Sequence, residues 1–345
     1  MRVLVVTNQY PIRQRPSYGA FVAEQVRSVV QSGVQVDVLF FNPRQTRLNY
    51  GLSLPRIVRA INSGSYDLVH THHTYSMLLV DLARMITGSR IPVVLTNHEG
   101  EVTDTDKRTR TWHPTSFLRH SLFVKRLAAR RADFVILVSR RATAALALDA
   151  PHEVIPCGVD LTTFRPLDQR ACRKQLNIPL QALVVFFPAS PRAEGKRFAL
   201  AQAAFEIVRA QVPHAILIPA GQIPHESMPL YYNAADVVLQ ASFYEASPTV
   251  VKETLACEVP LVSTDSGDTR EMIDGVHSCF VCRDDPLELA EHVLECVGQR
   301  AVGGRDRLLN IGLSLEQVAE RLIHVYEQVL DSTRASLTVS QKAEL

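Results

Sequence analysis

Short apolar runs alternate with helical patterns along the first half of the chain. The runs predict strands over residues 2–7, 36–41, 66–70, 91–96 and 134–138. Runs without polar alternation are typical of parallel strands buried on both faces. Helical patterns follow Gly19 and cover residues 54–61. This alternation predicts a parallel, doubly wound sheet.

The second half repeats the pattern in supersecondary structure, though not in sequence. Strands are predicted over residues 183–189, 215–219 and 237–240, and helices over 196–211 and 228–235. We therefore expect an α/β protein of two Rossmann-like, doubly wound domains facing a cleft. The N-terminal domain is placed at residues 1–160 and the C-terminal domain at 161–312.

The last helix has a recognisable start. Ser314 and Gln317 form a capping box ahead of a helical pattern over residues 315–330. Residues 331–345 lack periodicity, and we expect them to fray.

Two carboxylates stand out in residues 240–273. Ser247 is predicted as a helix N-cap and Pro248 as the first helical residue. Glu245 then lies in the loop before the helix, whereas Glu253 shares a helix face with Thr249. The N-terminus of a helix favours an anion. The stretch therefore suits a phosphorylated, polyhydroxylated ligand.

Composition excludes several other classes of protein. Lys and Arg number 37 against 35 acidic residues, which argues against a dedicated nucleic-acid binder. The dinucleotide fingerprint G-x-G-x-x-G is missing, which argues against a classical dehydrogenase. We expect a cytoplasmic protein whose six cysteines are reduced thiols. No apolar run is long enough to span a bilayer, so membrane contact would be peripheral.

Two short motifs allow metal binding as an alternative. Cys279 and Cys282 have the C-x-x-C spacing of redox or zinc sites, but lack a second pair, so we favour buried thiols. His70, His72 and His73 would need ligands from elsewhere to bind a metal.

The run from Glu245 through seven residues to Glu253, followed by the segment PLVSTDSG at residues 260–267, resembles the nucleotide-sugar site of family-four retaining glycosyltransferases of the GT-B fold. Cys157-Gly158-Val159-Asp160 resembles the interdomain junction of that family, where Asn is usual in place of Cys157. In GT-B enzymes the last helix commonly returns to the first domain, and the resemblance implies the same for residues 313–330.

The resemblance also assigns roles on the C-terminal domain. It places Glu253 at the ribose hydroxyls, Glu245 near the sugar and Lys196 against the diphosphate. Lys196 would then act where other transferases use a metal, so no metal cofactor is expected. Ser190 stands where the family often has an arginine, and Arg192 is a substitute from a shifted position.

Glycines and a histidine complete the expected site. Backbone N–H groups of Gly19, and of Ser266 with Gly267, are expected near phosphate or sugar, although Gly19 could serve helix geometry alone. Gly221 resembles the loop that contacts the base. His98 matches a family histidine that faces the donor sugar, with a structural loop histidine as the alternative.

The resemblance places the segment with His70, His72 and His73 beside the acceptor cleft. It therefore favours contact with the acceptor over metal binding for at least one of these histidines.

Residues 101–131 are rich in Lys and Arg with aromatic residues between them. Such a segment can lie on an anionic membrane surface, although a solvated helix that covers the sheet explains the same pattern.

Together these features predict a retaining, metal-independent glycosyltransferase. It would move a sugar from a nucleoside diphosphate donor, with uridine diphosphate (UDP) favoured, to a hydroxyl of a sugar or lipid-linked acceptor in polysaccharide, glycolipid or other glycoconjugate synthesis. A sugar-nucleotide epimerase and a non-catalytic nucleotide-sugar-binding protein are the alternatives. No nucleic-acid partner is expected. The expected location is the cytoplasm, with the inner face of the membrane as an alternative.

Overall fold

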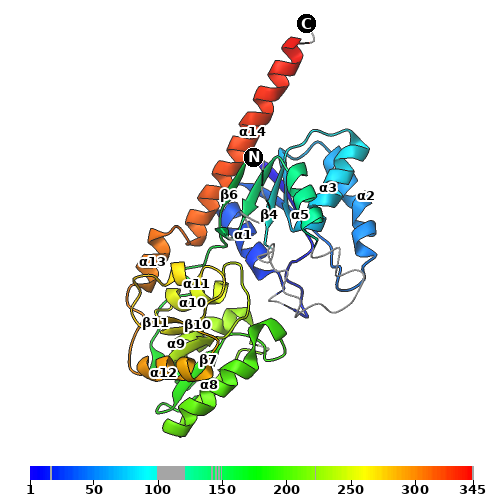
Figure 1. The fold of residues 1–345 in the computed structure, drawn as a ribbon. Helices are drawn as coiled ribbons and strands as arrows, with labels where there is room; N and C mark the ends of the chain where they lie inside the picture. The colour runs from blue at the N-terminus through cyan, green and yellow to red at the C-terminus, as the bar shows by residue number, and fades with distance from the viewer. Residues whose placement is uncertain are drawn as a thin grey trace. The chain divides into compact units, whose positions relative to one another are not determined.

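The computed structural model describes residues 1–15, 18–98, 121–140, 143, 146, 148, 150–221 and 223–343, with side chains as far as residue 335. The chain divides into two compact units (Figure 1). Unit 1 comprises Met1–Pro156 and Glu316–Leu345, and unit 2 comprises Cys157–Leu315. The division falls between Pro156 and Cys157, whereas the sequence predicts a boundary after Asp160.

Unit 1 is built on a six-stranded sheet in which every pairing is parallel. The strand order is β2-β1-β3-β4-β5-β6. Residues of β1, β3, β4 and β5 are buried at nearly every position, as their apolar runs predict. The strands are β1 (Arg2–Thr7), β2 (Gln35–Phe40), β3 (Leu68–His72), β4 (Val93–Asn97), β5 (Phe134–Leu137) and β6 (His152–Val154).

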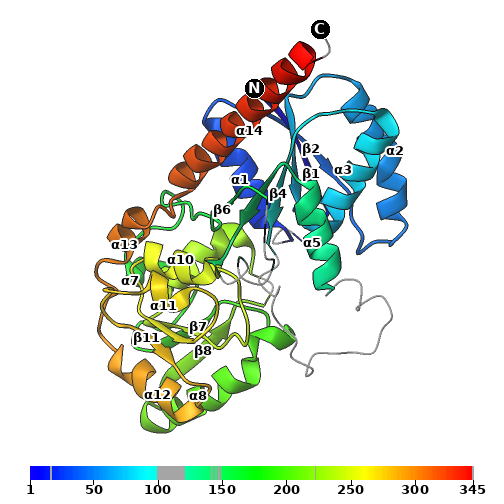
Figure 2. The same ribbon diagram turned by 45° about the horizontal axis from the view of Figure 1, so that its top comes forward.

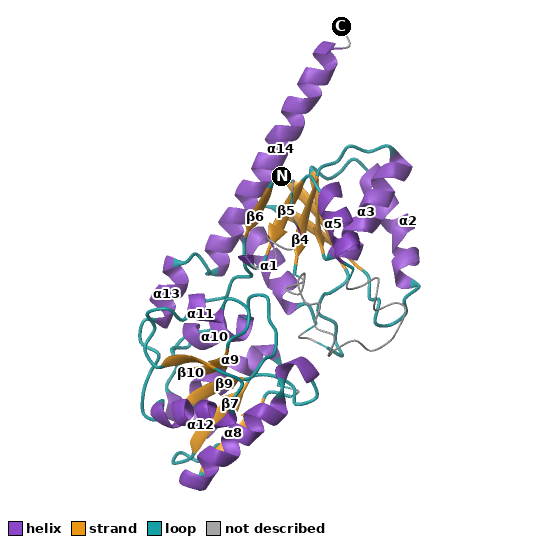
Figure 3. Cartoon of the chain, viewed as in Figure 1, coloured by secondary structure: helices purple, strands orange, loops and turns teal. Residues whose placement is uncertain are grey.

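Helices cover both faces of this sheet (Figures 2 and 3). Helices α2 (Asn49–Asn62), α3 (Thr74–Thr87) and α5 (Leu122–Arg131) pack on one face. Helices α1 (Ala20–Gln31) and α14 (Leu315–Ala343) pack on the other. Val318, Leu322 and Val325 of α14 are buried among residues of β1, β3 and β5. The last helix therefore completes the core of unit 1.

The end of α14 differs from the sequence prediction. Residues 331–345 were expected to fray, whereas the helix continues to Ala343. Neither glycine nor proline occurs after Gly312, so the sequence contains no strong helix breaker there.

Unit 2 contains a five-stranded parallel sheet in the order β11-β10-β9-β7-β8. Its strands are β7 (Leu183–Phe187), β8 (Ala215–Pro219), β9 (Val237–Gln240), β10 (Leu261–Thr264) and β11 (Cys279–Cys282). Helices α8 (Phe198–Gln211) and α12 (Pro286–Glu295) pack on one face. The other face is covered by α9 (Met228–Ala234), α10 (Thr249–Ala256), α11 (Thr269–Met272) and α13 (Gly304–Asn310). Helix α7 (Gln169–Gln175) contacts α9.

The two parallel sheets and their covering helices confirm the predicted α/β class. Two local predictions at the start of helices are wrong. Lys196 ends a short 3-10 turn, η2 (Glu194–Lys196), and α8 begins only at Phe198, because Arg197 adopts a left-handed conformation with φ 49°. Pro248, and not Ser247, is the N-cap of α10, because its backbone is extended with ψ 121°.

Candidate donor site and family

The strand order of unit 2 creates a topological switch point between β7 and β9. From β7 the chain crosses through α8 to β8 on one side, and it then returns through α9 to β9 on the other side. Ligands of open α/β sheets bind beside such a point, at the carboxyl ends of the strands. A small pocket lies there, lined by Ala189 after β7, by Gln240 and Ser242 at the end of β9, and by Lys196.

Lys196 and Glu245 meet at this edge. The Nζ atom of Lys196 donates a hydrogen bond to Oε1 of Glu245 in a partly buried ion pair. Lys196 follows β7 and Glu245 follows β9, so the switch point brings together two residues that are 49 positions apart. An ammonium group has three N–H donors, so Lys196 can hold the carboxylate and an anionic ligand simultaneously.

Arg197 anchors the turn that carries Lys196. Its guanidinium donates to the carbonyl oxygens of Ala241 (2.7 Å) and Ser242 (3.2 Å), and it pairs with the carboxylate of Asp284. Arg197 belongs to no motif that would single it out in the sequence. A left-handed residue between two helical patterns has no clear sequence signal unless it is Gly, Asn or Asp.

Glu253 lies one turn inside α10 and is almost fully buried, with 7% of its surface exposed. The hydroxyl of Tyr232 on α9 donates to its Oε2 atom at 2.6 Å. Burial, followed by the nearby charge of Glu253, raises the pKa of Tyr232 well above its usual value, so the phenol stays protonated. Thr249, on the same face, is the first residue of α10. The tyrosine therefore orients the carboxylate of Glu253.

Lys252 is a buried cation that the sequence analysis also missed. Its side chain is fully buried, and Nζ donates to the carbonyl oxygens of Cys157 (2.8 Å) and Ser247 (3.4 Å). Burial lowers the pKa of Lys252, whereas the carboxyl of Asp268 opposes that shift. Lys252 therefore ties the loop before α10 to the junction residue at the start of unit 2.

Ser266 and Gly267 form the turn after β10. Ser266 is buried, and its Oγ accepts a hydrogen bond from Nε2 of Gln240 at 3.3 Å. Gly267 has φ 61°, and a Cβ atom there would lie 2.7 Å from the carbonyl oxygen of Ala246. The turn therefore packs directly against the loop that carries Glu245.

We expect Gly267→Ala to destabilise the chain more than Gly275→Ala does. Both glycines have positive φ, which costs an L-residue about 1–2 kcal/mol. Only Gly267 also faces a backbone atom closer than real Cβ contacts allow, since nothing lies within 4 Å of a Cβ at Gly275. Urea unfolding of both variants measures the difference. Equal losses of unfolding free energy would show that the contact with Ala246 is unimportant.

Gly221 and Arg192 lie on neighbouring loops of unit 2. Gly221 follows β8 with φ 50°, and its N–H donates to the carbonyl oxygen of Ala189 at 3.4 Å. Arg192 is exposed, and its backbone N–H donates to Oγ of Ser190 at 3.3 Å. The two residues thus follow β8 and β7, on loops that leave the carboxyl edge of the sheet.

Gly19 and His98 belong to unit 1. Gly19 caps α1 with φ 70°, and a Cβ atom there would lie 2.5 Å from the backbone carbon of Gln9, so this position requires glycine. His98 follows β4, and its Nε2 hydrogen-bonds Nδ1 of His72 at 2.8 Å. Its ring also packs on Phe21, with centroids 4.6 Å apart. Both residues lie beyond carboxyl ends of strands.

His70 and His72 of β3 form a stacked cluster with His98, which follows β4. His70 lies between the hydroxyl of Tyr326 and the Oγ1 atom of Thr96, each 2.7 Å from a ring nitrogen. Its ring centroid is 4.4 Å from that of His72, which stacks on His98. Among the described residues, the histidines of this cluster form no group with metal-ligand spacing. Both ring nitrogens of His70 are hydrogen-bonded within unit 1, whereas the buried Nε2 of His72 has no hydrogen-bond partner among the described residues.

This cluster should make stability fall in mild acid. Burial lowers the pKa of His70 to about 3 and those of His72 and His98 well below the usual value. The unfolded chain takes up protons near pH 6.5, so stability is full above that pH and is lost as the pH falls. His70 alone should cost about 1.4 kcal/mol per pH unit below about 6.5.

Urea unfolding near neutral pH and about two pH units lower measures this slope. His70→Gln should flatten it, whereas His214→Gln, which alters an exposed histidine, should leave it unchanged. A slope that is the same in all three proteins would rule out a contribution from His70.

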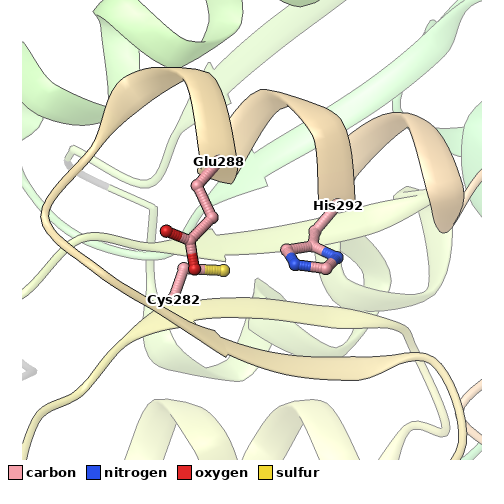
Figure 4. A group of neighbouring side chains, drawn as sticks. All are labelled: Cys282, Glu288 and His292. Carbon is pink, nitrogen blue, oxygen red and sulfur yellow. The ribbon is translucent and has the colours of Figure 1, made fainter.

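Cys282, Glu288 and His292 are the one group with metal-ligand spacing among the described residues (Figure 4). Arg283 already pairs with Glu288, and burial raises the pKa of Cys282 to about 12, so a thiolate there is costly. Cys279 packs into the core on the opposite face of the sheet. The C-x-x-C pair therefore points to two faces and cannot bind one metal.

Two family models match the chain. The model described as Glycosyltransferase Family 4 matches residues 1–163, and that described as Glycosyl transferases group 1 matches residues 192–299. The chain belongs to the family 4 glycosyltransferases. This glycosyltransferase is 25% identical over 344 residues to TuaC of Bacillus subtilis strain 168, which is named for teichuronic acid biosynthesis. The match covers 81% of the chain and 83% of TuaC.

Solved structures show the same GT-B fold. Sucrose-phosphate synthase from Thermosynechococcus elongatus aligns with a TM-score of 0.73 at 19% identity, covering 96% of the glycosyltransferase and all of that chain. Anabaena HepE in complex with UDP-glucose aligns with a TM-score of 0.61 at 16% identity, covering 97% and 100%. Lys196, Glu245 and Glu253 lie within the residues that the group 1 model matches.

Proposed function

We propose that this glycosyltransferase transfers a sugar from a UDP-sugar to an acceptor hydroxyl with retention of anomeric configuration. The observation that supports it is the pairing of Lys196 with Glu245 at the switch point, in the unit where Glu253 lies buried against Tyr232. The cation matches the diphosphate of such a donor, and the two carboxylates match the hydroxyls of its ribose and of its sugar. The HepE complexes with UDP and UDP-glucose favour uridine as the base.

Each residue has a role set by its chemistry. Glu253 accepts hydrogen bonds from the two ribose hydroxyls, and Tyr232 fixes its orientation. Lys196 stabilises the negative charge that forms on the leaving diphosphate. Glu245, held by Lys196, accepts hydrogen bonds from the sugar hydroxyls. N–H groups at the N-terminus of α10, near Thr249, and in the turn of Ser266 and Gly267 add donors for phosphate.

We propose supporting roles for four further residues that the sequence indicates. Arg192 supplies a second cation on the loop after β7, and Gly221 allows close approach of the base. On unit 1, Gly19 offers a backbone N–H to phosphate, and His98 hydrogen-bonds the sugar. These roles rest on the family resemblance and on the placement of each residue beyond a strand end.

The proposed reaction needs no nucleophile from the enzyme. The bond from the anomeric carbon to the diphosphate oxygen breaks, and a bond to the acceptor oxygen forms on the same face. The acceptor proton passes to the departing diphosphate. We propose that Lys196 supplies the positive charge for this step, without a metal ion. An acceptor carried on a lipid or a growing polysaccharide fits the naming of TuaC.

The test is incubation with a panel of nucleoside diphosphate sugars, with and without simple sugar acceptors and with and without EDTA. We expect UDP release that depends on the acceptor and persists in EDTA, and a product whose anomeric configuration by NMR equals that of the donor. A changed sugar without any acceptor would indicate an epimerase. Loss of release in EDTA would contradict metal independence.

A further inference from the structure

The helical layer formed by α2, α3 and α5 has an unusual charge balance. These helices contain seven basic residues and one acidic residue, Asp81, whereas the whole chain has 37 basic and 35 acidic residues. The basic residues are Arg56, Arg59, Arg84, Lys125, Arg126, Arg130 and Arg131. Lys125 is buried, and the arginines are exposed or partly exposed. One layer of unit 1 is therefore strongly cationic, although the protein is nearly neutral.

The same layer exposes large apolar side chains. Phe123 on α5 is 74% exposed, Met85 on α3 is 67% exposed and Leu52 on α2 is 66% exposed. Leu48, Leu82, Ile86 and Leu127 are exposed as well. Single exposed apolar residues are ordinary, but a set on adjacent helices marks an interaction surface.

These side chains share one outer surface. The opposite faces of the three helices are buried together, through Ile57 of α2, Met77 of α3 and Ala128 of α5, in one core cluster against the sheet. Helix α3 contacts both α2 and α5, and the three lie side by side in both views (Figures 1 and 2). Exposed residues recur three or four positions apart, as in Leu48 and Leu52 or Phe123 and Leu127, which is the spacing of one helix face.

A hollow between α3 and α5 adds a feature suited to anions. Arg84, Arg130 and Arg131 line it together with Met85 and Asp81. Arg131 pairs with Asp81 at 3.6 Å, and Arg84 pairs with Asp133 at 3.1 Å. The hollow thus combines three guanidinium groups with an exposed methionine at its edge. Guanidinium groups favour phosphate through bidentate hydrogen bonds.

We propose that the outer face of α2, α3 and α5, which we call the basic-apolar face, docks the protein on an anionic lipid bilayer. A bilayer surface offers negative headgroups to the arginines and an apolar layer to the exposed leucine, methionine and phenylalanine side chains. Nucleic acid would match the arginines but leave the aliphatic side chains without a partner. No helix within the described residues is both long and apolar enough to cross a bilayer.

This location differs from that expected in the sequence analysis. The basic segment at residues 101–131 overlaps the face only through α5, and residues 101–120 lie outside the described residues. Helices α2 and α3 were not expected to take part. Together they carry only three basic residues, Arg56, Arg59 and Arg84, and the face forms when the sheet places the three helices together.

Vesicle sedimentation tests the proposal without reference to catalysis. Wild-type protein is mixed at low salt with vesicles of phosphatidylcholine alone or of phosphatidylcholine with phosphatidylglycerol. We expect co-sedimentation only with the anionic vesicles, weakening as salt is added. No binding to anionic vesicles at low salt would overturn the proposal. The proposed transfer reaction could still be correct, because UDP release with a soluble acceptor does not depend on this face.

Two sets of substitutions separate charge from apolar insertion. The triple variant Arg59→Gln, Arg126→Gln, Arg130→Gln should lower vesicle binding on the order of 100-fold, since each basic residue near the surface contributes about 1 kcal/mol. The triple variant Leu52→Ser, Met85→Ser, Phe123→Ser should lower it at least about tenfold. The control removes three exposed arginines of unit 2, Arg209→Gln, Arg270→Gln and Arg300→Gln, and should bind nearly as wild type does.

Other occupants of the face would give different results. If the serine variant bound as wild type did while the glutamine variant lost all binding, a polyanion and not a bilayer would be the partner. If the wild type were a dimer that the serine variant dissociated, and neither bound vesicles, a second copy of the chain would cover the face. Either result would overturn the proposal.

Discussion

We expect the Lys196→Ala variant to lose about 100- to 1000-fold in kcat, with a smaller change in KM for the donor. The reason is that charge grows on the diphosphate as the glycosidic bond breaks, so a cation at that position stabilises the transition state more than the bound donor. Steady-state UDP release measures the effect. Lys174→Ala, which removes an exposed lysine of unit 2, is the matched control and should keep full activity.

A second variant separates catalysis from structure. Lys196 also neutralises Glu245, so its removal leaves a partly buried carboxylate without its cation. The double variant Lys196→Ala, Glu245→Gln removes that charge. We expect it to remain at least as impaired as Lys196→Ala alone. Recovery of activity in the double variant would mean that Lys196 serves only to balance Glu245, which would contradict its role at the leaving group.

We expect Glu253→Gln to weaken UDP binding by about 10- to 100-fold, because hydrogen bonds to a charged acceptor contribute about 1.5–3 kcal/mol. Calorimetric titration with UDP measures the change. Tyr232→Phe should give a smaller loss, because it removes only the hydroxyl that orients Glu253. Glu291→Gln, on the exposed side of α12, changes the same chemical group and should bind UDP as wild type does.

A double variant tests whether Tyr232 acts on UDP binding through Glu253. If Tyr232 acts through Glu253, the double variant Glu253→Gln, Tyr232→Phe should bind UDP about as weakly as Glu253→Gln alone. Additive losses would show that the two side chains contribute independently. Wild-type affinity in Glu253→Gln would contradict the ribose assignment altogether.

Much of the fold could be predicted from the sequence, because its strands are buried on both faces. Residues 3–6 and 183–187 are apolar in the sequence and buried in the sheets. The last helix was located from Ser314 and Gln317, but its extent was not, since residues 331–343 are helical without an apolar stripe in their sequence. The start of α10 was displaced by one residue, because Pro248 suits either a cap or a first turn.

The carboxylates and the lysine of the proposed donor site were singled out in the sequence through a motif whose parts are local. Their partners were not found. Tyr232 lies 21 residues before Glu253, and Lys252 reaches the carbonyl of Cys157 across 95 positions. These contacts depend on how helices pack on the sheet, and no local pattern encodes them. The same is true of the basic-apolar face, which three separate helices build.

Amide hydrogen exchange with and without UDP is the sharpest test of a donor site at the switch point, because it shows where on the chain the nucleotide binds. We expect UDP, at a concentration near the wild-type Kd, to slow exchange in the turn at residues 193–198, the segment at 245–254 and the turn at 266–268, and we expect Glu253→Gln to lose most of this protection. Protection confined to other segments of unit 2, or unchanged protection in Glu253→Gln, would contradict a donor site at the switch point.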